Sequence, residues 1–182
     1  VPPEATGIPE NYYFDGWYQV DTFDPNWKFD FENTPITAVT TLYAIWEPHD
    51  HVWAYAADGN KLCAYCTVDG YNCSYYGTES ELSKAITVEV NAPEERSGSL
   101  TYDGNAYVAT ITDTDGKWNL TFAGLPSIEY GYKEFGMEAA SYSSVTDTKD
   151  AGYYKASITV GDKTAYKEYQ IAKKTFTIDL SM

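Results

Sequence analysis

Apolar residues recur at every second position along much of this chain. The pattern is clearest over residues 86–90 and 154–160, where Val, Ile, Ala and Tyr alternate with polar side chains. The segments 107–111 and 118–122 show the same period. Because successive side chains of a strand point to opposite faces, this period indicates half-buried strands of antiparallel sheets. The sequence therefore predicts an all-β, mainly antiparallel fold.

Short turn sequences separate several of these segments. An Asp-Gly or Gly-Asp pair stands between two alternating runs at residues 58–59, 115–116 and 161–162. Such pairs are a strong local signal of a hairpin, so we expect three hairpins. Helical signals are few. Thr78 and Glu81 have the spacing of a capping box and predict at most one helical turn over 81–85.

The charge of the chain excludes some classes of partner. Lys and Arg total 12 against 27 Asp and Glu, a formal net charge of −15. A nucleic-acid-binding protein needs a basic face to meet phosphates, so we expect no nucleic-acid partner. The same acidity disfavours docking on an anionic membrane. No apolar run approaches the roughly 20 residues of a membrane helix, and we expect no membrane insertion.

Two aromatic motifs mark the first part of the chain. Phe-x-Gly-Trp-Tyr occupies residues 14–18 and Leu-Tyr-Ala-x-Trp occupies residues 42–46. Together they closely resemble the Listeria–Bacteroides repeat, a B-repeat-like module of bacterial surface proteins. The resemblance implies a β-grasp-like module over residues 1–47 that is incomplete, because it lacks its first strands. Its core would contain Phe14, Trp17 and Trp46. A sheet without those strands has an edge with which another chain could pair.

A second resemblance lies near the end of the chain. Asp150-x-Gly152-x-Tyr154, with Ala156 at the position of a cysteine, is similar to strand F of the immunoglobulin fold. In that fold the equivalent tyrosine forms a tyrosine corner. The segment resembles the Ig-like repeats of Firmicutes surface proteins, which implies an Ig-like β-sandwich over residues 93–174.

These resemblances also divide the rest of the chain and imply a function. Residues 48–92 would form a Cys-bearing β-hairpin segment packed with or leading into the sandwich, and 175–182 would begin a following strand or repeat. We expect a non-catalytic part of a secreted or cell-wall-attached bacterial surface protein, acting as a spacer in adhesion. Its partners would be neighbouring repeats of the same chain and host or cell-wall glycan or protein, with no cofactor. Both histidines lie far in sequence from any Gly-flanked serine, so we expect no enzyme.

One cluster could carry chemistry: Cys63-x-x-Cys66 and Cys73, with His49-x-His51 upstream. Similar surface repeats often have one cysteine near Cys66 and another near Cys73, which favours a disulfide between these two and leaves Cys63 unpaired or buried. A zinc site of His51, Cys63, Cys66 and Cys73 is the alternative, since it fits the tetrahedral nitrogen and sulfur preference of zinc. Free buried thiols are a third interpretation. A thioredoxin-like pair would need a βα turn, for which the sequence offers no helix.

Three tyrosines crowd the polar loop that contains Cys73. Tyr71, Tyr75 and Tyr76 are candidates for exposed rings that stack on a sugar, which is the basis of an alternative function as a glycan- or host-protein-binding module. The competing interpretation is that small β modules use their aromatic residues as core and cross-strand partners.

Overall fold

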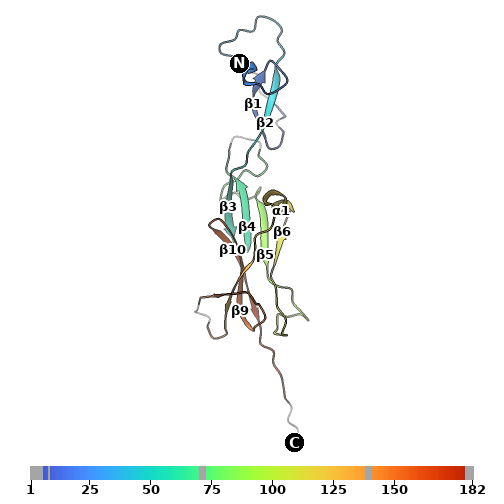
Figure 1. Ribbon diagram of the computed structural model, residues 1–182, viewed down its shortest axis with the longest axis vertical. Coiled ribbons are helices and arrows are strands. Elements are labelled where there is room, and N and C mark those ends of the chain that lie inside the picture. Colours follow the sequence, from blue (N-terminus) through green and yellow to red (C-terminus); the bar gives the residue numbers. More distant parts are fainter. Residues whose placement is uncertain (1–5, 8, 70–72, 138–140, 179–182) are drawn as a thin grey trace. The chain divides into compact units, whose positions relative to one another are not determined.

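The computed structural model describes residues 6–7, 9–69, 73–137 and 141–178 (Figure 1). Nearly all of its regular structure is antiparallel β, which confirms the predicted class. The elements in chain order are β1 (Tyr12–Tyr18), η1 (Pro25–Trp27), β2 (Tyr43–Pro48), β3 (Trp53–Asp58), β4 (Lys61–Cys66), β5 (Ile86–Asn91), β6 (Thr110–Asp113), α1 (Lys117–Phe122), β7 (Glu129–Lys133), β8 (Ser143–Val145), β9 (Gly152–Val160) and β10 (Lys163–Ile171).

The chain divides into two compact units that interleave in sequence. The first contains Val1–Ala54 and Tyr65–Lys84, and the second contains Tyr55–Ala64 and Ala85–Met182. The division expected after residue 47 falls inside the first unit. The division expected after residue 92 falls between β5 and β6, which pair with each other in one sheet.

The first unit is built around the pair β1–β2. Phe14 lies opposite Trp46 in the register of this pair. Their ring centroids are 5.2 Å apart, and Trp17 packs edge-on against Phe14 at 5.5 Å. The three motif aromatics therefore pack on one another, although each stays half-buried. Tyr18, at the end of β1, is only 1 % exposed.

Lys28, the single Lys or Arg before Pro48, forms an ion pair in this unit. Lys28 Nζ lies 3.0 Å from a carboxylate oxygen of Asp15, which also accepts a hydrogen bond from the Tyr18 hydroxyl. Burial acts to raise the pKa of Asp15, but these two hydrogen bonds outweigh it and lower that pKa. The lysine stem crosses Gly16, where an added Cβ would come within 2.7 Å of Lys28 Cε. A larger residue at this position would push the lysine away from its partner.

One sheet has the order β3-β4-β5-β6, and most of its residues belong to the second unit, although the first two residues of β3 and the last two of β4 belong to the first. The hairpin expected at residues 58–59 is present between β3 and β4, with Gly59 at φ +58°, the left-handed region that favours glycine. Strand β5 confirms the alternation seen in the sequence, because Ile86, Val88 and Val90 are all fully buried.

The segment expected to be the second arm of the hairpin at residues 115–116 is instead the helix α1, so that prediction is wrong. The carboxylate of Asp113 accepts the backbone N–H groups of Trp118 and Asn119 at 3.2 and 3.0 Å, which satisfies donors of the first helical turn. Trp118 and Phe122 are four residues apart and their rings meet at 4.8 Å, whereas Leu120 is 83 % exposed. The apolar spacing suited both a strand and one helical face.

No helical turn forms over residues 81–85, so the prediction of a helical turn from the capping-box spacing is also wrong. Thr78 and Glu81 exchange backbone hydrogen bonds with each other, at 2.9 and 3.4 Å. A tight turn of this kind uses the backbone groups that a helix would have needed.

The other sheet of the second unit has the order β10-β9-β7-β8. Strands β9 and β10 form the hairpin expected at residues 161–162, in continuous register. Alternate residues of β9 are buried, namely Tyr154, Ala156 and Ile158. Beyond β10, Ala172 forms a parallel bridge with Thr101, so the segment before β6 is tied to the end of the last strand.

Candidate metal centre

Two histidines and two cysteines converge in the first unit. They are His49, His51, Cys66 and Cys73, and one ligand atom from each lies within 4.8 Å of all the others. His49 Nε2 is 3.2 Å from Cys66 Sγ, and His51 Nδ1 is 3.5 Å from Cys73 Sγ. Two nitrogen and two sulfur donors in one cluster are able to bind a transition-metal ion.

The two histidines stand two residues apart in the segment that leads into β3. Their rings lie edge to face, with centroids 4.7 Å apart. The other arm comes from β4, which ends at Cys66 beside this segment (Figure 1). The backbone N–H of Thr67 donates to the carbonyl of Val52 at 2.9 Å and holds the two arms together.

A turn over residues 73–76 brings in the fourth donor. Its backbone is anchored to Cys66, whose N–H donates to the carbonyl of Tyr75 at 2.8 Å and whose carbonyl accepts from Gly77 at 3.1 Å. Asn11 joins this turn to the histidine arm. Its carbonyl accepts the N–H of His49 at 2.9 Å, and its side-chain oxygen accepts the hydroxyl of Ser74 at 3.1 Å.

The cluster is largely shielded from water. Cys66 is 0 % exposed, Cys73 3 % and His49 8 %, while His51 is half-buried. Burial, together with the neighbouring His49, lowers the pKa of His51. Burial also raises the pKa of the Cys73 thiol, although backbone N–H groups of Tyr75 and Tyr76 donate to its sulfur and act in the opposite direction.

The structure changes both predictions for the cysteines. Cys66 and Cys73 are free, so the disulfide favoured by the sequence is not formed here. The zinc alternative named Cys63 as a ligand, and the structure corrects this: the residue that lies with His51, Cys66 and Cys73 is His49. Cys63 and Cys66 are three residues apart on β4 and so point to opposite faces. Cys63 instead lies in the second unit, with its sulfur 3.5 Å from the hydroxyl of Thr87. The His-x-His spacing was the signal that could have identified His49.

The tyrosines of this loop divide between the cluster and its surroundings. Tyr75 packs on the cluster, with its ring 5.4 Å from His51 and 5.5 Å from Trp53. Tyr76 is half-buried, and burial followed by the nearby Asp69 raises the pKa of its phenol. Tyr71 lies outside the described residues. Of these tyrosines, Tyr75 therefore has aromatic partners within the cluster.

The residues named for the tyrosine corner lie together in the second unit. The hydroxyl of Tyr154 donates to the backbone carbonyl of Asp150 at 3.0 Å. The ring of Tyr154 stacks on Tyr169 at 5.3 Å and 10°. Gly152 is closely covered by Tyr132, because a Cβ added there would lie 2.4 Å from that ring. These contacts hold the start of β9 against β7 and β10.

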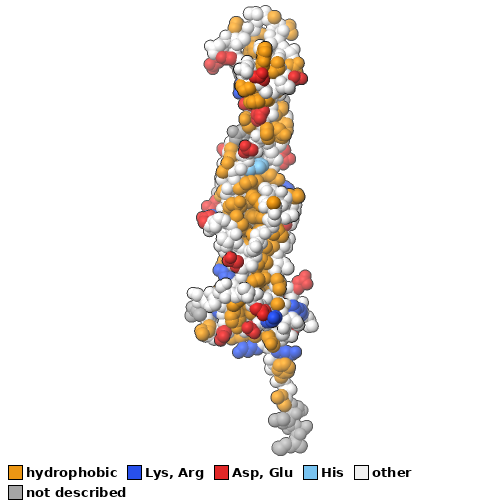
Figure 2. All heavy atoms as spheres, in the orientation of Figure 1, with side chains coloured by type: hydrophobic (Ala, Val, Ile, Leu, Met, Phe, Trp, Pro, Cys, Tyr) orange, Lys and Arg blue, Asp and Glu red, His pale blue; other side chains and the backbone are white. Residues whose placement is uncertain are grey.

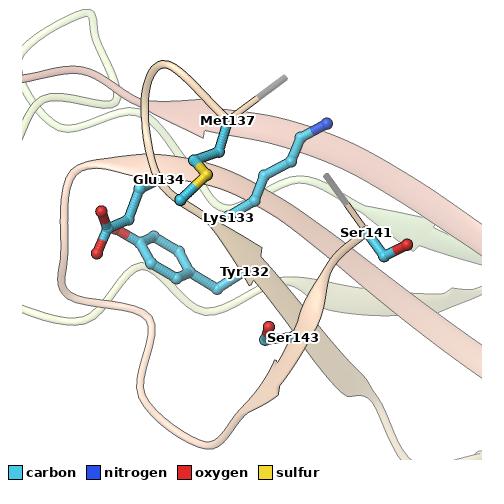
Figure 3. Close-up of a pocket in the computed structure, with 6 residues that line it drawn as sticks. All are labelled: Tyr132, Lys133, Glu134, Met137, Ser141 and Ser143. Atoms are coloured by element: carbon cyan, nitrogen blue, oxygen red, sulfur yellow. The ribbon is translucent and has the colours of Figure 1, made fainter. Parts of the chain in front are cut away.

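A shallow pocket of about 240 Å³ opens near β7 and β8 in the second unit. Figure 3 shows Lys133 and Glu134 pointing to opposite sides of it, with the hydroxyls of Ser141 and Ser143 apart from both. Lys133 Nζ lies instead over the ring of Tyr142, at 4.7 Å. A nucleophile needs a base within hydrogen-bond reach, and the described residues that line this pocket make no such pair.

None of the family models, curated proteins or solved structures compared with this chain matches it. Among the described residues, no helix is long and apolar enough to cross a membrane. On the face drawn in Figure 2, acidic side chains are scattered singly among polar and hydrophobic ones.

Proposed function

We propose that this chain belongs to a secreted or cell-wall-attached bacterial surface protein, where it acts as a non-catalytic spacer in adhesion. It would combine an incomplete β-grasp-like module with an Ig-like module. The observation that best supports this is the hydrogen bond from Tyr154 to the carbonyl of Asp150. In Ig-type sandwiches a tyrosine near the start of strand F bonds to the backbone a few residues upstream in the same way.

Two further contacts support the modular interpretation. In the first unit, Phe14 and Trp46 come from the two aromatic motifs and pack across β1 and β2. In the second unit, the carbonyl of Ala172 accepts the N–H of Tyr102 at 2.9 Å, and its own N–H donates to Leu100 at 2.8 Å. These bonds tie the two ends of the proposed Ig-like module, which suits a spacer that must keep its shape under tension.

The aromatic residues favour the spacer over the glycan-binding alternative. The ring of Tyr75 packs against His51 and Trp53, and the ring of Tyr154 stacks on Tyr169. Sugar recognition by stacking requires a ring face that is open to the ligand. The contacts of these tyrosines instead follow the cross-strand and core packing common in β modules.

Stretching single molecules of the chain between two handle domains tests the spacer directly. We expect at least one cooperative unfolding event, followed by a length gain of roughly 3.5 Å per released residue. Extension without any force peak would contradict the proposal. The purified chain should also give no reproducible binding on a glycan array. Binding that is lost in Tyr76→Ala would replace the spacer with a glycan-binding function.

A further inference from the structure

We infer that His49, His51, Cys66 and Cys73 form a closed structural site for one Zn²⁺ ion. This inference does not depend on the proposed spacer function. The four residues come from the segment before β3, from the end of β4 and from the turn over 73–76, all within the first unit.

The spacing of the donor atoms fits a single tetrahedral ion. Zinc lies about 2.3 Å from sulfur and about 2.05 Å from nitrogen, so tetrahedral angles place neighbouring donors roughly 3.4–3.8 Å apart. The His49–Cys66 and His51–Cys73 donor pairs are 3.2 and 3.5 Å apart. The widest separation in the cluster is at most 4.8 Å. The donors therefore need to shift by no more than about 1 Å to share one ion.

The set of donors selects zinc and indicates a structural role. Two thiolates with two imidazoles in a tetrahedron are typical of zinc or of an iron–sulfur cluster. A two-iron cluster with mixed ligands would hold its histidines on one iron and its cysteines on the other. Here each histidine nitrogen lies beside a cysteine sulfur instead. Four protein ligands also leave no position for water or substrate, which distinguishes structural from catalytic zinc sites.

The surroundings of the cluster support its ligands from outside. Tyr75 and Trp53 pack around His51. The backbone N–H of Tyr76 donates to the carbonyl of Cys73 at 3.3 Å and so fixes the backbone of this ligand. Asn11 holds the histidine arm and the turn over 73–76 at fixed separation. Groups of this kind orient the ligands and raise metal affinity. A bound ion would complete the link between the segment before β3, the end of β4 and the turn over 73–76.

The test measures metal content in the full chain, purified without a histidine tag because its only two histidines are the proposed ligands. We expect one zinc per chain by elemental analysis. Replacement by Co²⁺ should give the intense visible absorption of a tetrahedral site and a thiolate charge-transfer band. A strong chelator should remove the ion and expose two additional thiols to a maleimide reagent, and added zinc should protect them again.

Cys66→Ser and His49→Ala should weaken zinc binding by more than about 100-fold, since changes in groups that merely support metal ligands cost 10–100-fold. Cys63→Ser is the matched control, because it alters the same strand outside the cluster and should keep one zinc. Circular dichroism should show that all three variants retain their β structure. If a variant does not fold, the unmodified chain still tests the inference, because a chelator should expose its two thiols and added zinc should protect them again.

Three results would overturn the inference that a metal site exists. One is a metal content well below one equivalent in the unmodified chain after incubation with zinc. Another is equal loss of zinc in Cys63→Ser and Cys66→Ser. The third is an intact mass two hydrogens lower without reductant, together with a peptide map that links Cys66 to Cys73. Iron or copper binding in preference to zinc would overturn the choice of metal.

Discussion

The tyrosine corner offers the sharpest test of how the second unit is stabilised. Tyr154→Phe deletes one hydroxyl from a side chain that is 1 % exposed and bonded to the carbonyl of Asp150 at 3.0 Å. A hydrogen bond contributes about 0.5–1.5 kcal/mol net, and a buried carbonyl left without a donor costs more. Asp150 is itself exposed, so water can reach its carbonyl. We therefore expect a loss of about 1 kcal/mol, which corresponds to a Tm lower by about 4 °C in a unit of this size.

Urea unfolding followed by circular dichroism measures this difference. Tyr166→Phe is the matched control, because it removes a hydroxyl from an exposed tyrosine of β10 and should change the free energy of unfolding by less than about 0.5 kcal/mol. Tyr154→Ala should cost about 3–5 kcal/mol, as expected for deletion of a buried ring. If Tyr154→Phe is as stable as Tyr166→Phe while Tyr154→Ala is not, the ring alone stabilises the corner and the hydrogen bond contributes no measurable stability.

Three further predictions concern the second unit. Gly152→Ala should destabilise it by about 1–3 kcal/mol in urea, because the new Cβ would lie 2.4 Å from the ring of Tyr132; unchanged stability would contradict this packing. Burial and then the nearby Asp150 raise the pKa of Tyr154 to about 12, from 10.0. Its contribution to stability is therefore present below pH 10 and lost as the pH rises toward 12, and the phenolate absorbance step near pH 12 should be smaller in Tyr154→Phe. The Arg96 guanidinium lowers the pKa of Asp103 below 3.8, so the pair stabilises the fold above that pH and ceases to do so on acidification. The stability difference between the unmodified chain and Arg96→Gln should accordingly shrink at low pH, and a constant difference would contradict this pairing.

The local features of the fold could be predicted from the sequence. The alternation over residues 86–90 and 154–160 became β5 and β9, because a strand presents successive side chains to opposite faces wherever it lies. The hairpins at residues 58–59 and 161–162 formed because small polar turn residues adopt the required backbone conformation with little help from the rest of the chain. Local alternation was misleading at residues 118–122, where the carboxylate of Asp113 accepts N–H groups of a helical turn. It was also misleading at residues 107–109, which lie outside any strand because β6 begins only at Thr110.

The candidate metal centre could be predicted only in part. The sequence indicated a cluster of cysteines with a nearby histidine, and three of the four donors named for zinc do converge. Which fourth residue joins them depends on the face of β4, since Cys63 and Cys66 point in opposite directions. The exclusion of Cys63 therefore follows from strand geometry, whereas His49 is placed by the tertiary contact of its backbone N–H with Asn11.

The sequence by itself determined β5, β9 and the turns at residues 58–59 and 161–162, because these depend on residues that are close neighbours along the chain. Only the tertiary structure decided that the two units interleave and that four donors meet. Asn11 bonds to Ser74, and His49 meets Cys66. Contacts over such separations depend on how complete elements pack, and no local pattern of residues specifies that packing.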